Sequence, residues 1–235
     1  MVSLQGLVFS SVQQRTYPPD TLLNSVNAVA DLKALPADFE FTLKAWQLIT
    51  HEAKSPTYRR LKRQLSRTEK AEAGGFRATE IVNEAWGATL AAAQVLRAKT
   101  ILFQCPSSFK QTAANIAGME KFFCSIDRQD LNLCWEPRGE WDAAVVKSIC
   151  VSLELCHVVD PFIGKTVTPD NYYFRLHGRS GWRYQYETGE LKELATSIVK
   201  SKRGYVFFNN SKMTEDALKF CKLLDDLNDR RDFCN

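Results

Sequence analysis

The chain has 235 residues, of which 45% are hydrophobic and 25% are charged, and its formal net charge at pH 7 is +4. This composition is ordinary for a globular protein, and no run of residues approaches the ~20 apolar positions that a membrane-spanning helix requires. The first residues lack the charged start and long apolar core of a secretory signal, so we expect a cytoplasmic protein.

Short apolar runs alternate with helical patterns along the chain. Strands are predicted over 7–13, 39–45, 99–105, 131–136, 155–160, 172–177 and 204–210. Helices are predicted over 21–34, 56–68, 79–97, 109–124, 141–149, 188–201 and 214–228. Strands that alternate with helices indicate a parallel sheet covered by helices. We therefore expect an α/β fold, a TIM-type (β/α) barrel with seven recognisable strands, as a single domain over residues 1–235. Eight strands would close such a barrel, so this one is expected to be incomplete.

Polar side chains stand at the carboxyl ends of these strands, where the active sites of such barrels form. Residues alternate faces along a strand, so Gln104 shares a face with Leu102, and Glu136 shares a face with Cys134. If these faces point inward, seven side chains meet at one mouth: Lys44, Gln104, Glu136, Asp160, Arg175, His177 and Asn209. A buried charge in such a group needs a partner or a shifted pKa, because uncompensated burial is costly.

The candidate catalytic residues are Glu136, Asp160 and His177. The two carboxylates suit general acid/base chemistry, although either of them could instead orient an arginine. His177 titrates near neutral pH, and its alternative role is to bond its own turn.

The candidate binding residues are two kinds of cation and two amides. Lys44 either holds an anion or pairs with a carboxylate inside the barrel. Arg138 and Arg175 offer planar donors that fit carboxylate or phosphate, or they form structural ion pairs. Gln104 and Asn209 either bind substrate or satisfy backbone groups at the strand ends.

Two further segments suit an anionic partner, either a small molecule or nucleic acid. Residues 54–70 are strongly basic with Glu69 as their one acid, a pattern that a solvated helix face also shows. The loop 179–186 interleaves arginine with tryptophan and tyrosine, which suits stacking on bases or a rigid lid over the barrel. No phosphate-cradling glycine loop and no metal-spaced histidines or cysteines occur, so we expect no cofactor and no metal, and we expect reduced thiols.

Five stretches of the chain, taken together with their order and spacing, are typical of one protein family. They are 39–45 with 49–51, 101–109, Trp135-Glu136-Pro137-Arg138-Gly139-Glu140-Trp141, Tyr173-Phe174-Arg175-Leu176-His177-Gly178, and 205–211. Over residues 11–226 the chain resembles the YecE-like proteins, the family of domain of unknown function 72. The resemblance implies a TIM-type barrel with a polar pocket at its C-terminal mouth. It also implies the pocket's members: Lys44, Gln104, Glu136, Arg138, Arg175, His177 and Asn209.

The chain departs from the family's pattern at its start. The family usually opens on a glycine-rich strand near Gly-Thr-Ser-Gly-Trp, which nothing here matches, and Ser11 stands where the next strand usually carries glutamate. The resemblance therefore implies that the first β/α unit is missing and that one edge strand is open. An open edge invites pairing, so we expect a homodimer or another partner to cover it.

Two hypotheses of function follow. The first is a hydrolase or lyase that acts on a phosphate-bearing or nucleic-acid substrate, with Glu136 as general base or acid and Asp160 or His177 as its counterpart. The alternative is a non-catalytic binding module for a small anionic ligand. A weaker third hypothesis is a glycoside-processing barrel that uses Glu136 and Asp160.

Overall fold

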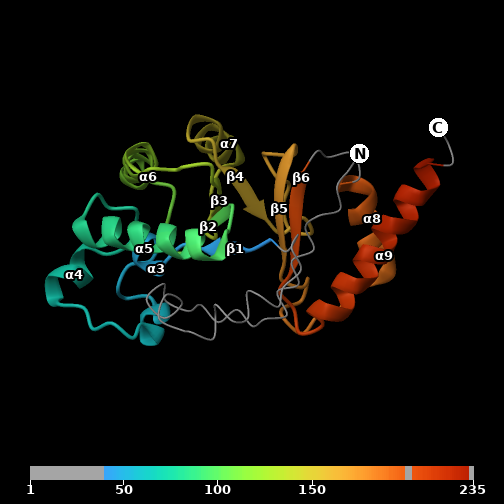
Figure 1. Ribbon diagram of the computed structural model, residues 1–235, viewed down its shortest axis with the longest axis horizontal. Coiled ribbons are helices and arrows are strands. Elements are labelled where there is room, and N and C mark those ends of the chain that lie inside the picture. The colour runs from blue at the N-terminus through green and yellow to red at the C-terminus, as the bar shows by residue number, and fades with distance from the viewer. Residues whose placement is uncertain (1–39, 199–202, 233–235) are drawn as a thin grey trace. The chain divides into compact units, whose positions relative to one another are not determined.

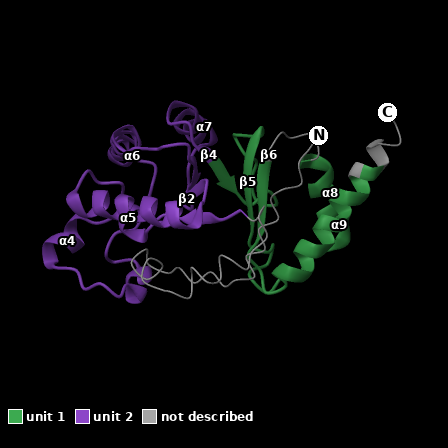
Figure 2. Cartoon of the chain, in the orientation of Figure 1, with its two compact units in different colours: residues 1–15, 157–235 green, residues 16–156 purple. Residues whose placement is uncertain are grey.

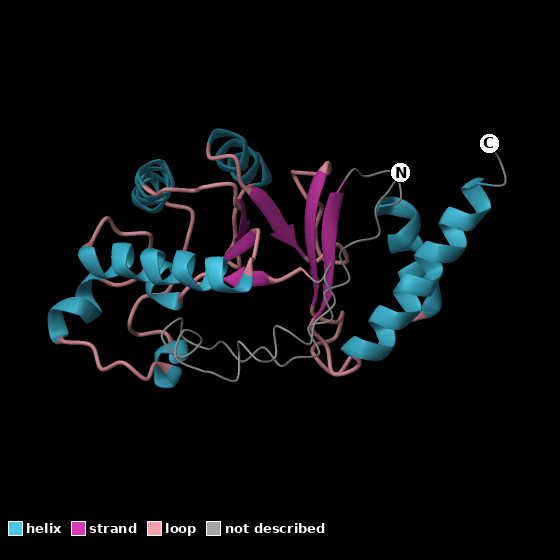
Figure 3. Cartoon of the chain, viewed as in Figure 1, coloured by secondary structure: helices cyan, strands magenta, loops and turns pink. Residues whose placement is uncertain are grey.

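The computed structural model describes residues 40–198 and 203–232, and Figures 1 and 3 show their helices and strands. The described part forms two compact units, which divide between Cys156 and His157 (Figure 2). The strand expected over 7–13 and the helix expected over 21–34 lie outside the described residues. No helix in the described ranges has both the length and the apolar character needed to cross a bilayer.

Unit 2 contains three parallel strands, in which β1 (Thr42–Lys44) pairs with β2 (Thr100–Gln104) and β2 pairs with β3 (Asn132–Glu136). Its helical elements are α3 (Gln47–Thr50), the 3₁₀ helix η1 (Pro56–Arg60), α4 (Arg67–Glu72), α5 (Glu80–Leu96), α6 (Ala113–Ser125) and α7 (Ala143–Ser152). Strand and helix alternate as the sequence predicts for a parallel sheet.

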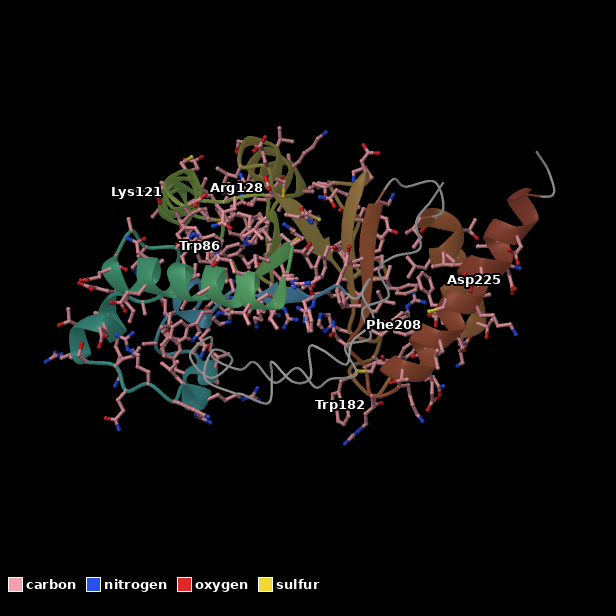
Figure 4. All side chains as sticks on the ribbon, viewed as in Figure 1. Trp86, Lys121, Arg128, Trp182, Phe208 and Asp225 are labelled. Carbon is pink, nitrogen blue, oxygen red and sulfur yellow. The ribbon has the colours of Figure 1, made fainter. Side chains whose placement is uncertain are left out.

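The core of unit 2 lies on one face of its strands, against α5 and α6. The ring of Phe103 in β2 lies 5.8 Å, centroid to centroid, from that of Trp86 in α5, which Figure 4 labels. It lies 5.0 Å from the ring of Phe123 in α6. Because side chains alternate along a strand, Leu102 and Gln104 lie on the opposite face of β2 from Phe103. The aromatic face therefore leaves the other face to the strand-end polar residues.

Side-chain caps mark where α6 and α7 begin. The side chain of Thr112 accepts a hydrogen bond from the backbone N–H of Asn115, and Asp142 caps α7 through the N–H of Ala144. Such caps satisfy backbone donors that the first helical turn leaves unpaired. The helix α5 ends at Arg97, which adopts a left-handed conformation with a φ of 52°.

Unit 1 contains a second set of parallel strands. Here β4 (Cys156–Val159), which begins at the last residue of unit 2, pairs with β5 (Asn171–Leu176), and β5 pairs with β6 (Arg203–Phe208). The helices are α8 (Thr188–Ile198) and α9 (Met213–Asp232). Phe174 and Phe208 face these helices within one apolar cluster, and the Phe208 ring lies 5.8 Å from that of Phe220 in α9.

These elements confirm the α/β class and six of the expected strands. The alternation of parallel strands with helices is consistent with an incomplete TIM-type barrel. The single domain over residues 1–235, the open edge and the partner that covers it stay predictions.

The prediction of one helix over 56–68 is wrong, because the segment forms two short helices with an extended stretch between them. Ser55 caps η1, which Pro56 opens, and η1 ends at Arg60. A new helix, α4, begins at a capping box in which Ser66 and Glu69 each bond the other's backbone N–H. Between them residues 61–66 are not helical, and Leu65 is buried.

Candidate functional site

Three polar residues end the strands of unit 2, and the parallel register brings them to the same edge. Lys44, Gln104 and Glu136 are the last residues of β1, β2 and β3. Gln104 stands directly opposite Glu136 in the register, while Lys44 stands opposite Leu102. Register partners in parallel strands share a face, so these side chains lie on the face opposite the aromatic core. The alternation predicted from the sequence is confirmed in this unit.

Hydrogen bonds connect these side chains to Arg138, which follows β3. The Lys44 ammonium donates to Gln104 Oε1, and Gln104 Nε2 donates to Glu136 Oε1 across 3.5 Å. Arg138 Nε donates to the same Glu136 oxygen at 2.8 Å. The amide of Gln104 therefore bridges a cation and a carboxylate, one at each of its ends. Glu136 is buried, whereas the side chain of Arg138 is 40% exposed.

His51 lies close to these residues, although it was not among the site residues predicted from the sequence. His51 is 6% exposed, and its Nδ1 lies 2.7 Å from the hydroxyl oxygen of Thr50. Burial, and then the positive charges of Lys44 and Arg138, lower the pKa of His51 from 6.5 to about 4. The available signal was its position just after the short helix α3, inside the 49–51 stretch of the family resemblance.

We call these five residues the edge cluster: Lys44, His51, Gln104, Glu136 and Arg138. At neutral pH the imidazole is uncharged, so the charged groups of the cluster are two cations and one carboxylate. An arginine fork and a lysine ammonium are the usual protein ligands of phosphate and carboxylate. The cluster can therefore hold an anion beside an imidazole and a carboxylate.

In unit 1, the structure brings Asp160 to the backbone of His177. Asp160 Oδ1 accepts the N–H of Phe162 at 3.0 Å, and Oδ2 accepts the N–H of His177 at 2.9 Å. Each carboxylate oxygen thus holds one backbone donor, and the turn after β4 is tied to the end of β5. These bonds support a positioning role for Asp160, while the catalytic roles of Asp160 and His177 stay predictions.

Arg175 and Asn209 also lie at the carboxyl ends of strands in unit 1. Arg175 is buried and stands opposite Phe207 in the register of β5 and β6. Arg175 and Phe207 share one face of these strands. Phe174 and the apolar cluster that packs on α8 and α9 lie on the opposite face. Asn209 follows β6, and its backbone N–H donates to Leu176 O at 2.8 Å. Their parts in substrate binding stay predictions.

The arginine- and aromatic-rich loop 179–186 is anchored at its end and exposed at its centre. Tyr186 Oη accepts the N–H of Gly178 at 2.8 Å, and Asn210 Nδ2 donates to the carbonyl of Tyr184 at 2.7 Å. Trp182 is nevertheless 61% exposed (Figure 4), with the Arg183 guanidinium 4.6 Å from the centre of its ring. The loop thus holds an aromatic ring out to solvent.

Burial raises the pKa of Cys105 and of Cys150 to about 12, so both thiols are protonated at neutral pH. All the cysteines in the described ranges are free thiols. Across residues 40–198 and 203–232, no three His, Cys, Asp or Glu side chains are grouped so as to hold a metal ion.

The fold and its strand-end residues define an α/β protein of the incomplete TIM-barrel type. The chain matches the model of DUF72, a protein family of unknown function, over residues 27–233, and it belongs to this family. The resemblance to the YecE-like proteins, the family of domain of unknown function 72, is therefore confirmed.

Two crystal structures of DUF72 family proteins are similar to this one. The protein from Enterococcus faecalis V583 has 22% identity and a TM-score of 0.63, with 85% of this chain and 79% of that chain covered. The protein from Thermotoga maritima MSB8 has 24% identity and a TM-score of 0.63, with 91% and 82% covered. At these identities the likeness shows the fold. No curated protein matches the chain.

Proposed function

We propose that this protein is a hydrolase or lyase that binds a phosphate-bearing substrate at the edge cluster and acts on it by general acid/base chemistry. One observation carries the proposal: two cations, a carboxylate and an uncharged imidazole lie together at the carboxyl ends of three neighbouring strands. That end of a parallel sheet is where α/β proteins bind their ligands.

The binding step depends on Lys44 and Arg138. The partly exposed side chain of Arg138 can be reached from solvent, and its planar donors match phosphate oxygens. Lys44 adds a point charge that Gln104 orients through its amide oxygen. A phosphate held here would offset the two positive charges that the cluster carries.

The chemical step depends on His51 and Glu136. The charges of Lys44 and Arg138 contribute to lowering the pKa of His51, so a bound phosphate dianion raises this pKa toward the range that suits proton transfer. Glu136 is the second acid/base group, oriented by the donors of Gln104 and Arg138. Substrate binding therefore prepares the imidazole for its role.

One observation favours the alternative, a non-catalytic binding module for a small anion. The Glu136 carboxylate accepts a hydrogen bond from Arg138 at 2.8 Å, so its role can be to orient that guanidinium for binding. The Glu136→Gln variant separates the two functions, because it removes a proton-transfer group and keeps an oxygen that accepts from Arg138.

The first experiment follows the histidine rings by NMR during pH titrations with and without inorganic phosphate. Phosphate should raise the pKa of His51 and leave that of His157 unchanged, because burial alone lowers the pKa of His157. Lys44→Met should raise the pKa of His51 without phosphate and weaken its response to phosphate. An unchanged His51 pKa in phosphate would refute the anion site.

The second experiment measures turnover of p-nitrophenyl phosphate and bis(p-nitrophenyl) phosphate. The wild-type protein should hydrolyse one of these esters, and Glu136→Gln should lose this turnover while its His51 still responds to phosphate. A phosphate response in the wild-type protein without turnover of either ester would favour the binding module.

A further inference from the structure

A pocket lies in unit 2 where the chain passes from η1 to α4, outside the edge cluster. Its volume is about 360 Å³, and it is lined by Ala53 together with Tyr58, Leu61, Arg63, Gln64, Leu65 and Lys70. This volume falls within the range of small-molecule sites in proteins. The segment is the teal stretch between α3 and α4 in Figure 1.

Contacts from three directions hold the walls of this pocket in place. Tyr58 Oη donates to the carbonyl of His51 at 2.7 Å, which ties η1 to the end of α3. Arg63 Nη1 donates to Glu84 of α5 at 3.0 Å, and Nη2 donates to Glu69 of α4. Two of the lining side chains, Tyr58 and Arg63, are therefore held in place by neighbouring helices.

The lining combines apolar and donor side chains. Leu61, Leu65 and the ring of Tyr58 supply apolar surface, while Arg63, Gln64 and Lys70 supply N–H groups. Such a combination suits a ligand with one anionic group and a small apolar body.

The surrounding charge is strongly positive. Arg63 is neutralised by Glu69 and Glu84, and Lys54 pairs with Glu52. The other basic residues of the segment are exposed and have no carboxylate partner in the part of the chain that the structure describes: Arg59, Arg60, Lys62, Arg67 and Lys70. An excess of exposed cations of this kind raises the local concentration of anions and steers them to nearby donors.

We propose that this pocket is a second ligand site, which binds a phosphate monoester with a small aromatic group. Lys70 and Gln64 bind the phosphate, the fixed guanidinium of Arg63 orients it, and Leu61, Leu65 and Tyr58 contact the aromatic group. The proposal does not depend on the edge cluster, because none of the pocket's lining residues belongs to that cluster.

The test measures the affinity of phenyl phosphate by calorimetry for the full chain carrying Lys44→Met, so that the edge cluster is disabled, with benzyl alcohol as the uncharged probe and inorganic phosphate as the probe without a ring. Phenyl phosphate should bind tighter than either, and its Kd should increase with salt concentration. Lys70→Met should raise that Kd about tenfold, as the loss of a charge-assisted hydrogen bond does. Ala53→Leu, which fills the pocket without changing charge, should also weaken binding.

Two controls separate this site from other cations. Lys121→Met removes an exposed lysine from α6, away from this segment in Figure 4, and should leave the affinity unchanged. In this Lys44→Met background the edge cluster is disabled, and phenyl phosphate should still bind at the pocket. Unchanged affinity in both Lys70→Met and Ala53→Leu would overturn the proposal, and so would equal affinity for benzyl alcohol.

Discussion

Gly74 offers the sharpest test of how the backbone is arranged beside the edge cluster. Its φ is +82°, in the left-handed region, and its N–H donates to Leu48 O at 2.7 Å. A Cβ added at this residue would lie 2.1 Å from the carbonyl oxygen of His51 and 2.6 Å from the backbone nitrogen of Glu52. Both contacts are with backbone atoms, which cannot turn aside as a flexible side chain does.

The expected cost of Gly74→Ala has two parts. The left-handed conformation costs a residue with a Cβ about 1–2 kcal/mol. Forcing a methyl group into a closed contact costs a further ~1–3 kcal/mol. The free energy of unfolding should therefore fall by about 3 kcal/mol, which corresponds to a midpoint of thermal unfolding lower by roughly 10 °C in a chain of this size.

Two other glycines serve as matched controls in urea unfolding. Gly75 also has a positive φ, +62°, but its added Cβ would meet only the Arg77 side chain at 3.7 Å, so Gly75→Ala should cost about 1 kcal/mol. Gly87 lies in α5 with nothing within 4 Å, so Gly87→Ala should stabilise by about 0.5–1 kcal/mol.

The comparison between Gly74→Ala and Gly75→Ala decides the outcome. Equal stability of these two variants would refute the close approach of Gly74 to the His51 carbonyl. Because the clash is with His51 itself, Gly74→Ala should also weaken the response of the His51 ring to phosphate, whereas Gly75→Ala should preserve it.

Two further predictions concern unit 1. Burial holds the pKa of His157 near 4 against 6.5, so the unfolded chain binds the proton first and the free energy of unfolding falls as the pH drops from 6.5 to about 4. His157→Asn keeps an acceptor for the N–H of Val167 and should remove part of this fall in urea unfolding at several pH values; an unchanged slope would contradict the burial argument. Asp216 is fully buried and accepts from Tyr186 N and Asn210 Nδ2, so Asp216→Ala should cost about 3 kcal/mol by leaving two buried donors unpaired. A loss below ~1 kcal/mol would show that water replaces the carboxylate there.

The strands could be predicted from the sequence because each one is a short apolar run with a clear stop. The runs before Pro106, Pro137 and Gly178 end where a proline or a glycine interrupts the pattern, and the structure ends β2, β3 and β5 beside them. The polar strand ends were predictable for the same reason, since alternation assigns Gln104 and Glu136 to one face of neighbouring strands.

The prediction of one helix over 56–68 overlooked a local signal, the capping box of Ser66 and Glu69 at which α4 begins. The sequence could not show that Arg63 donates to Glu84, which lies on α5. The helix predicted over 109–124 begins only at Ala113 for a similar reason. Phe109 packs on Trp141, with ring centroids 5.9 Å apart, and Trp141 is distant in sequence. A local pattern does not contain these long-range contacts.

The role of His51 could not be predicted from the sequence for the same reason. Its sequence neighbours Thr50 and Glu52 do not mark it as a site residue, because Lys44 and Arg138 come close to it only in the folded chain.

The order of apolar runs, prolines and glycines by itself determined the α/β class, the positions of six strands, and the polar residues that end β1, β2 and β3. Only the tertiary structure decided that Gln104 bridges Lys44 to Glu136, that His51 stays uncharged beside them, and that 53–70 encloses a pocket. The physical reason is the distance along the chain over which each interaction acts. Backbone preferences and side-chain alternation act between adjacent residues, whereas a hydrogen bond, a shifted pKa or a cavity depends on which distant segments the folded chain brings within a few ångströms.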